Sequence, residues 1–87
     1  MDQLRSLRIF AQVVTAGSFA GAARALDMAP AGVTRAIADL ETHLGVRLLQ
    51  RTTRSLALTD IGEAYLQRVR EVLAGVDEAD AAAGAQT

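Results

Sequence analysis

With 87 residues the chain is long enough for one small domain built around a three-helix core, and it has no cysteine for disulfide bonds or thiolate metal sites. Its net charge of −1 hides an asymmetry, because residues 1–70 carry nine Arg against six acidic residues while the tail from Glu71 carries four acidic residues and no base, a pattern typical of a basic binding region with an acidic appendage. No apolar run approaches the roughly 20 residues that span a bilayer, and the first residues are charged where a signal peptide is apolar, so we expect a soluble cytoplasmic protein without membrane contact.

Capping residues and helical spacing predict the first two helices. Asp2 is a good N-cap for a helix that ends at Gly17, and Ser18 is a good N-cap for a second helix. The buried face of the first helix is predicted to carry Leu4, Leu7, Phe10, Ala11 and Val14. The buried face of the second is predicted to carry Phe19, Ala22, Ala23 and Leu26.

A third helix is predicted from Ala29 to Leu44. Pro30 suits the first turn of a helix because the N–H that proline lacks has no partner there. Four apolar residues at i, i+4, i+7 and i+11 form one stripe for burial, namely Val33, Ile37, Leu40 and Leu44. Gly45 ends the helix, and the very short turn before Pro30 predicts a helix-turn-helix.

The opposite face of this third helix is slim and uncharged apart from one arginine. It carries Ala31, Thr34, Arg35, Ala38 and Thr42. Such a face suits the major groove of DNA, where Thr and Arg can contact base edges and Ala can touch a thymine methyl group. An Ala-rich surface helix in an alanine-rich protein fits the periodicity equally well.

A hairpin is predicted next, from two short segments at 47–51 and 55–59. Leu56 and Leu58 alternate with polar or small residues, so one side is predicted to pack on the core while the tip projects Thr53 and Arg54. A projecting basic tip is typical of a DNA-binding wing. The alternative is a surface hairpin with ordinary solvated arginines.

The last element is predicted as a long helix from Asp60 to about Ala82, capped by Thr59. Apolar residues in it alternate spacings of four and three, which is typical of a coiled-coil seam: Tyr65, Val69, Val72, Val76, Ala79 and Ala83. With Leu66 and Leu73 beside it, this stripe is wider than an exposed helix should show, which predicts a homodimer. The alternative is a helix that covers only its own core.

Several motifs together resemble one family. They lie at residues 7–10, 17–26, 33–37, 40–49, 51–54 and 58–62, and they occur in the order in which the family has them. On these motifs the chain resembles the N-terminal DNA-binding domain of LysR-type transcriptional regulators over nearly its whole length. The resemblance implies a mainly α fold, namely a winged helix-turn-helix with a three-helix core, a β-hairpin wing and a long C-terminal linker helix.

The resemblance also implies how the chain divides into domains. Residues 1–59 are expected to form the winged helix-turn-helix, and residues 60–87 the dimerising linker helix and tail. Dimer contacts are expected at Tyr65, Val69, Val72, Val76 and Ala79. A small-molecule effector is expected to bind only a C-terminal domain that is absent from this chain. The full-length protein is expected to be a homodimer, with a tetramer as a second option.

The DNA contacts implied by the resemblance fall on three parts of the domain. Helix 30–44 is expected in the major groove, and the wing 47–58 at the flanking minor groove. Base-facing roles fall on Pro30, Ala31, Thr34 and Arg35, phosphate contacts on Ser18 and Arg51, and wing-tip contacts on Thr53 and Arg54, with Arg54 in the minor groove. This chain has Ala29-Pro30-Ala31 where many family members have Ser-Gln-Pro, so it lacks a capping hydroxyl and an amide that could contact adenine.

The predicted function is sequence-specific binding of a pseudo-palindromic double-stranded DNA site as a homodimer, in bacterial transcription regulation. An enzyme is not expected, since the chain has one histidine, no cysteine and no lysine. His43 is assigned to the C-terminal end of its helix, and no metal or cofactor is expected. The alternative function is a winged-helix or helical dimer module used only for protein–protein contacts.

Overall fold

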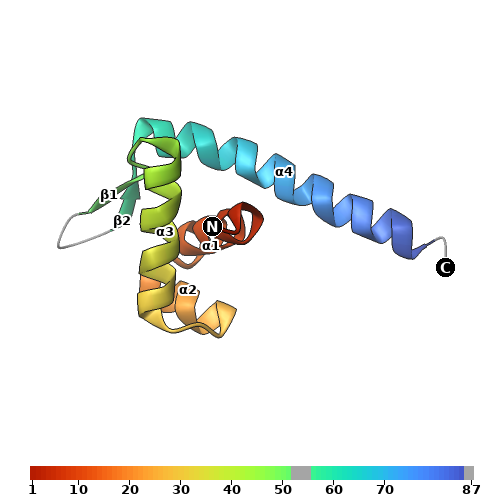
Figure 1. The fold of residues 1–87 in the computed structure, drawn as a ribbon, viewed down its shortest axis with the longest axis horizontal. Helices are drawn as coiled ribbons and strands as arrows, with labels where there is room; N and C mark the ends of the chain where they lie inside the picture. Colours follow the sequence, from red (N-terminus) through yellow and green to blue (C-terminus); the bar gives the residue numbers. More distant parts are fainter. Residues whose placement is uncertain (52–55, 86–87) are drawn as a thin grey trace.

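Helices and one antiparallel hairpin follow one another along the chain (Figure 1). The computed structural model describes residues 1–51 and 56–85. Within these ranges the elements are α1 (Gln3–Ala16), α2 (Phe19–Leu26), α3 (Pro30–Leu44), β1 (Leu49–Arg51), β2 (Leu56–Leu58) and α4 (Asp60–Gly84). The molecule measures 49 × 26 × 22 Å along its principal axes. The end of α4 projects well beyond the body that the other elements form. The described helices include none with the length and apolar character needed to cross a membrane.

Helices α1, α2 and α4 begin where capping side chains predict that they begin. The side-chain oxygens of Asp2, Ser18 and Thr59 each accept the backbone N–H of the residue three positions later, at 3.1, 2.9 and 2.9 Å. Each bond satisfies an N–H that has no partner inside the helix. The three predicted N-caps are therefore confirmed.

Left-handed backbone conformations end the first three helices. Gly17 and Gly45 have φ of 77° and 71°, as predicted for helix-terminating glycines. Asp27 has φ of 54° in the turn between α2 and α3. An aspartate tolerates this conformation better than most residues, so the turn between the two helices needs no glycine.

The core lies between α1, α2 and α3, and α4 and the hairpin cover its remaining side. The buried apolar residues are Leu7, Ile9, Phe10, Val13, Ala22, Ala23, Val33, Ala36, Ile37, Leu40, Leu48, Leu49, Leu66 and Val69. The predicted buried face of α1 is wrong at Leu4, which is 38% exposed, while Ile9 and Val13 are buried instead. Because α1 packs against α2, α3 and α4, it is buried over a wider arc than one amphipathic stripe.

The stripe predicted for α3 is confirmed at three of its four positions. Val33, Ile37 and Leu40 are completely buried, while Leu44 is half-buried where the helix ends. Ala36 and Glu41 join the buried face. The rotation of α3 about its axis is therefore fixed by packing.

The hairpin is shorter than the sequence pattern suggests. Its two strands are antiparallel, with Leu49 opposite Leu58 and Arg51 opposite Leu56. Leu56 and Leu58 are half-buried and Ala57 is exposed, as the alternation predicts.

The first turn of α4 lies directly against the backbone that leads into β1. A methyl group at Gly62 would overlap the carbonyl oxygen of Leu48. Gly75, in the outer part of the same helix, has nothing within 4 Å of the space that a methyl group would occupy. The two glycines therefore make a matched pair.

We predict that Gly62→Ala lowers the free energy of unfolding by about 2–3 kcal/mol, because the backbone at Leu48 or that of α4 must move to admit the methyl group. Gly75→Ala should raise it by about 1 kcal/mol, since alanine favours a helix and meets no obstacle. Urea unfolding of both variants at one protein concentration measures the two effects. A Gly62→Ala protein as stable as the wild type would contradict the close approach.

Candidate nucleic-acid interface

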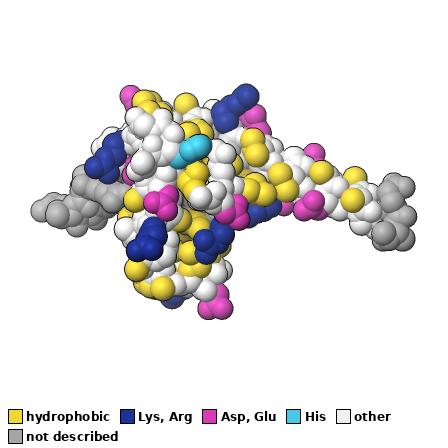
Figure 2. Space-filling view, in the orientation of Figure 1, with side chains coloured by type: hydrophobic (Ala, Val, Ile, Leu, Met, Phe, Trp, Pro, Cys, Tyr) yellow, Lys and Arg dark blue, Asp and Glu magenta, His cyan; other side chains and the backbone are white. Residues whose placement is uncertain are grey.

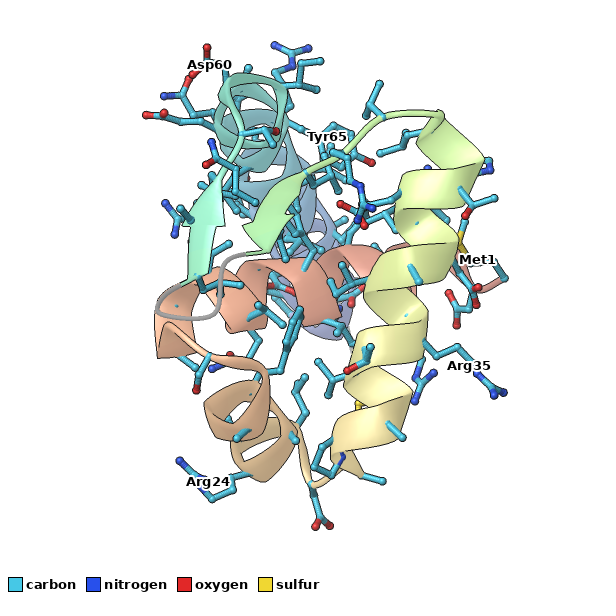
Figure 3. All side chains as sticks on the ribbon, turned by 90° about the vertical axis from the view of Figure 1, so that its left-hand side faces the viewer. Met1, Arg24, Arg35, Asp60 and Tyr65 are labelled. Atoms are coloured by element: carbon cyan, nitrogen blue, oxygen red, sulfur yellow. The ribbon has the colours of Figure 1, made fainter. Side chains whose placement is uncertain are left out.

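The outer face of α3 is set by the side chains that the same helix buries. With Val33, Ile37 and Leu40 turned into the core, Thr34 and Arg35 lie on the exposed side. Figure 3 shows the Arg35 side chain extending from α3 away from the body of the molecule. The predicted orientation of this helix is therefore confirmed.

Arg35 is exposed and keeps its hydrogen-bonding capacity. It makes no ion pair with any residue in the described part of the chain. A guanidinium group carries five N–H donors in a planar fork and no acceptor. Arg35 can therefore bind a pair of acceptor atoms, such as those of guanine or of a phosphate.

Thr34 is exposed too, but its hydroxyl group is already engaged. The hydroxyl donates to the carbonyl oxygen of Pro30, one turn earlier in α3, at 3.2 Å. A hydroxyl has one hydrogen and two lone pairs. In this conformation Thr34 therefore offers its surroundings an acceptor and a methyl group, while its hydroxyl hydrogen faces Pro30.

The first turn of α3 is slim and has no capping side chain. Pro30 and Ala31 are exposed, and Ala29 occupies the N-cap position without a side-chain hydrogen bond. Ser18 is exposed at the start of α2, where its oxygen accepts the N–H of Gly21. A hydroxyl that accepts in this way keeps its own hydrogen for an external acceptor, such as a phosphate oxygen.

The hairpin lies beside α3, at the end of the molecule opposite the projecting part of α4 (Figure 1). The backbone of Arg51 belongs to β1, but its side chain lies outside the described part of the structure. Thr53 and Arg54 also lie outside the described residues. The three wing contacts stay predictions from the sequence.

Glu41 is a structural residue of this region whose role the sequence analysis missed. Its side chain is 8% exposed, and its Oε2 atom accepts the backbone N–H groups of Leu48 at 2.8 Å and of Leu49 at 3.3 Å. A guanidinium nitrogen of Arg47 lies 3.7 Å from Oε1. The signal was available, since Glu41 follows Ile37 by four residues and so falls on the buried stripe.

Groups with metal or catalytic chemistry are sparse around α3. His43 is exposed in the last turn of the helix, where a positive charge interacts favourably with the helix C-terminus. Across residues 1–51 and 56–85, no three or more His, Cys, Asp or Glu side chains are grouped so that they could hold a metal ion. The exposed groups of α3 can therefore act on a ligand through hydrogen bonds and charge.

The predicted seam of α4 divides into two parts. Tyr65 is half-buried and its ring lies 6.0 Å from that of Phe10, centre to centre, at an angle of 42°. Val69 is only 2% exposed, in the core of its own chain. The dimer contact predicted for Val69 is wrong, because burial in the core of its own chain leaves this side chain no surface for a partner.

The outer part of the seam is largely exposed. Val72 is 49% exposed, Val76 is half-buried and Ala79 is exposed. Figure 2 shows hydrophobic side chains in a row along this part of α4. An ion pair of 3.1 Å between Arg8 of α1 and Asp77 ties the same part of α4 to the body.

Comparison with known proteins identifies the family. The family model of bacterial regulatory helix-turn-helix proteins of the lysR family matches residues 4–63. The chain belongs to this family. An HTH-type transcriptional repressor of Pseudomonas aeruginosa strain UCBPP-PA14 is 49% identical over 81 residues, which cover 93% of this chain and 26% of the repressor.

Two further LysR-type proteins are similar to most of the chain. The HTH-type transcriptional activator AaeR of Escherichia coli K12 is 41% identical over 78 residues, which cover 90% of this chain and 25% of AaeR. The crystal structure of the BenM DNA-binding domain with catB site 1 DNA has a TM-score of 0.88 and 37% identity, and covers 93% of this chain and 86% of that chain. This chain thus spans about a quarter of the length of the full regulators that it matches.

Restoring a hydroxyl at the N-cap of α3 should stabilise this LysR-type domain. We predict that Ala29→Ser raises the free energy of unfolding by about 1 kcal/mol, because serine accepts an N–H of the first turn and alanine cannot. The extended backbone of Ala29, with φ of −68° and ψ of 141°, already suits a capping residue.

Thermal or urea unfolding measures this effect, with Ala29→Gly as the matched variant. Glycine at the N-cap should give a smaller gain than serine, because it frees the backbone but accepts nothing. Equal stability of the serine variant and the wild type would show that the first turn of α3 has no unsatisfied N–H for serine to bind.

Proposed function

We propose that the chain is the DNA-binding part of a LysR-type transcriptional regulator and that it binds a specific double-stranded site as a homodimer. In this proposal α3 lies in the major groove and the wing at the flanking minor groove. The observation that carries it is the exposed Arg35, which has no ion-pair partner among the described residues, beside Thr34 on the slim face of α3. The BenM domain, which has the same fold, was crystallised with DNA, and this supports the proposal.

The proposed base contacts differ in chemistry between Thr34 and Arg35. In the major groove adenine and cytosine present an amino group, whereas guanine and thymine present only acceptors for hydrogen bonds. Because the Thr34 hydroxyl donates to Pro30, we assign Thr34 to a base with an amino group. Arg35 is assigned to the paired acceptors of guanine, and Pro30 and Ala31 to close apolar contact.

The remaining proposed contacts position the protein on the duplex. Ser18 donates its hydroxyl hydrogen to a phosphate oxygen, and Arg51 pairs with another phosphate. Arg54 enters the flanking minor groove, with Thr53 beside it at the wing tip. The basic balance of residues 1–70 favours such contacts.

Effector binding and the full assembly belong to a longer regulator, because this chain covers about a quarter of its relatives' length. We assign effector binding to a C-terminal domain and allow a tetramer as the full-length state. We also propose a cytoplasmic location, because regulation of transcription in bacteria takes place there, and we propose no enzymatic activity. One relative is described as a repressor and another as an activator, so this domain alone does not choose the direction of control.

The specificity of α3 can be tested after selection of a preferred site from random duplexes. Arg35→Ala should weaken binding to that site about ten-fold or more while leaving binding to random duplex almost unchanged, because a bidentate base contact is worth about 1–3 kcal/mol. Thr34→Val should remove the preference for an amino-bearing base at one position. Fluorescence anisotropy at two salt concentrations measures both variants.

The matched control is Thr15→Val, at an exposed site on α1 and outside the proposed DNA-contacting helix. It makes the same chemical change and should alter neither affinity nor preference. Equal losses for Arg35→Ala on the selected site and on random duplex would move Arg35 to the phosphate backbone. Failure of the wild-type protein to bind duplex DNA at low salt would favour the alternative function, a module used only for protein–protein contacts.

Dimerisation is proposed through the exposed part of the α4 seam, at Val72, Val76 and Ala79, with Tyr65 at its inner end. We predict that Val72→Asp gives monomers, because a carboxylate would be buried against a partner helix. Sedimentation at high micromolar concentration measures the change. Loss of the dimer should also replace a pseudo-palindromic footprint on DNA by a single half-site.

Ala74→Asp is the matched control for this experiment. Ala74 is exposed and lies about 200° around the helix from Val72, so the same charge is added on the far side. A wild-type protein that is monomeric at high concentration, or a Val72→Asp protein that still dimerises, would show that this seam is not the interface.

A further inference from the structure

Leu48, which precedes β1 and is completely buried, is bonded to two helices at once. Its N–H donates to Glu41 of α3 at 2.8 Å. Its carbonyl oxygen accepts the backbone N–H of Thr59, the N-cap of α4, at 3.0 Å. One residue of the chain therefore joins the helix assigned to DNA contact to the helix assigned to dimerisation.

The α3 side of this joint is a buried carboxylate with fixed partners. Oε2 of Glu41 accepts two successive N–H groups, those of Leu48 and Leu49, and Oε1 faces Arg47. Hydrogen bonds to an ionised acceptor are about twice as strong as neutral ones, and a buried carboxylate is costly without them. Glu41 therefore holds the approach to β1, the backbone at residues 46–48, at a set distance from α3.

The α4 side is built from Thr59 and Gly62. The Thr59 hydroxyl donates to the carbonyl oxygen of Arg47 at 2.7 Å, with the Leu48 carbonyl oxygen also near at 3.3 Å. The hydroxyl oxygen of Thr59 in turn accepts the backbone N–H of Gly62 at 2.9 Å. Since Gly62 has no side chain, the first turn of α4 rests directly on the Leu48 carbonyl group.

We propose that Glu41 and Thr59 are positioning residues that fix the angle between α3 and α4 through Leu48, and that this angle sets the half-site spacing that the dimer accepts. The proposal rests on the proposed function, in which α3 contacts DNA and α4 forms the dimer. Neither residue touches DNA in it. Both act by holding the approach to β1 between the two helices.

Half-site spacing is a sensitive measure of this angle. Adding one base pair moves one half-site by about 3.4 Å along the duplex and turns it by about 35°, since a turn takes about 10 base pairs. A rigid joint cannot follow such a turn without strain in the protein or in the DNA. A loosened joint can follow it.

The first experiment measures dimer binding to sites whose spacer differs by one base pair. The result is the ratio of affinities between the preferred spacing and its neighbours, because a general loss of affinity cancels from this ratio. Thr59→Val keeps the shape of threonine and removes the hydroxyl, and it should lower the ratio about three-fold or more. Glu41→Gln removes the charge and should act in the same direction.

Conservative variants separate positioning from general damage. Thr59→Ser keeps the hydroxyl and should keep the wild-type ratio, while Glu71→Gln, at an exposed site on α4, removes a charge without touching the joint. Folded Thr59→Val and Glu41→Gln proteins that discriminate between spacings as sharply as the wild type would overturn the proposal.

The second experiment tests the joint without DNA. Because the sequence has no cysteine, Asp39→Cys on α3 and Glu78→Cys on α4 provide two exposed sites for spin labels. Electron–electron resonance on labelled protein diluted with unlabelled protein then gives the distance distribution within one chain. We expect a narrow distribution in the labelled protein with Thr59, a broad one with Thr59→Val, and a narrow one again with Thr59→Ser.

The two experiments fail in different ways. Absence of DNA binding by the wild type would contradict the proposed function. The distances between the spin labels would still show whether Thr59 fixes the angle between α3 and α4. A broad distribution with Thr59 in place would overturn the inference even if Thr59→Val and Glu41→Gln fail to fold. A distribution that stays narrow in folded Thr59→Val protein would overturn it as well.

Discussion

Burial of one stripe of α3 is the constraint on which the rest of the interface depends. Val33, Ile37 and Leu40 are completely buried, and at about 25 cal/mol per Å² of apolar surface their removal from water makes any other rotation of α3 costly. The exposed face is the geometric complement of that stripe. Thr34 and Arg35 are therefore aimed outward by residues that never meet a ligand.

The polar chemistry of α3 is determined by hydrogen bonds inside the helix as much as by residue identity. Thr34 gives its hydrogen to Pro30 in this conformation, so a residue that can be both donor and acceptor presents its acceptor to the outside. Arg35 presents donors only. The two neighbours are complementary, and together with small residues around them they offer a simple pattern of one acceptor and one donor fork.

The long helix α4 does two kinds of work along its length. Its first turns complete the core through Leu66 and Val69, and this helix packs against α1. Its outer part carries Val72 and Ala79 on the surface, with Asp77 tied to α1 by an ion pair. An exposed pair of this kind contributes little stability, so the direction of α4 depends mainly on the buried first turns and on their contact with Leu48.

Local signals in the sequence determined most of the secondary structure, because caps, helix-ending glycines and apolar spacing act over a few residues: Asp2, Gly17, Ser18, Pro30, Gly45 and Thr59 all lie where predicted. The same spacing oriented α3 correctly. Tertiary structure decided what depends on several elements at once: that α1 buries Ile9 and Val13 in place of Leu4, that Val69 belongs to its own core, and that Glu41 bonds the backbone before β1. Periodicity reports which face of a helix is apolar, but only packing shows which neighbour covers that face and which polar group it encloses.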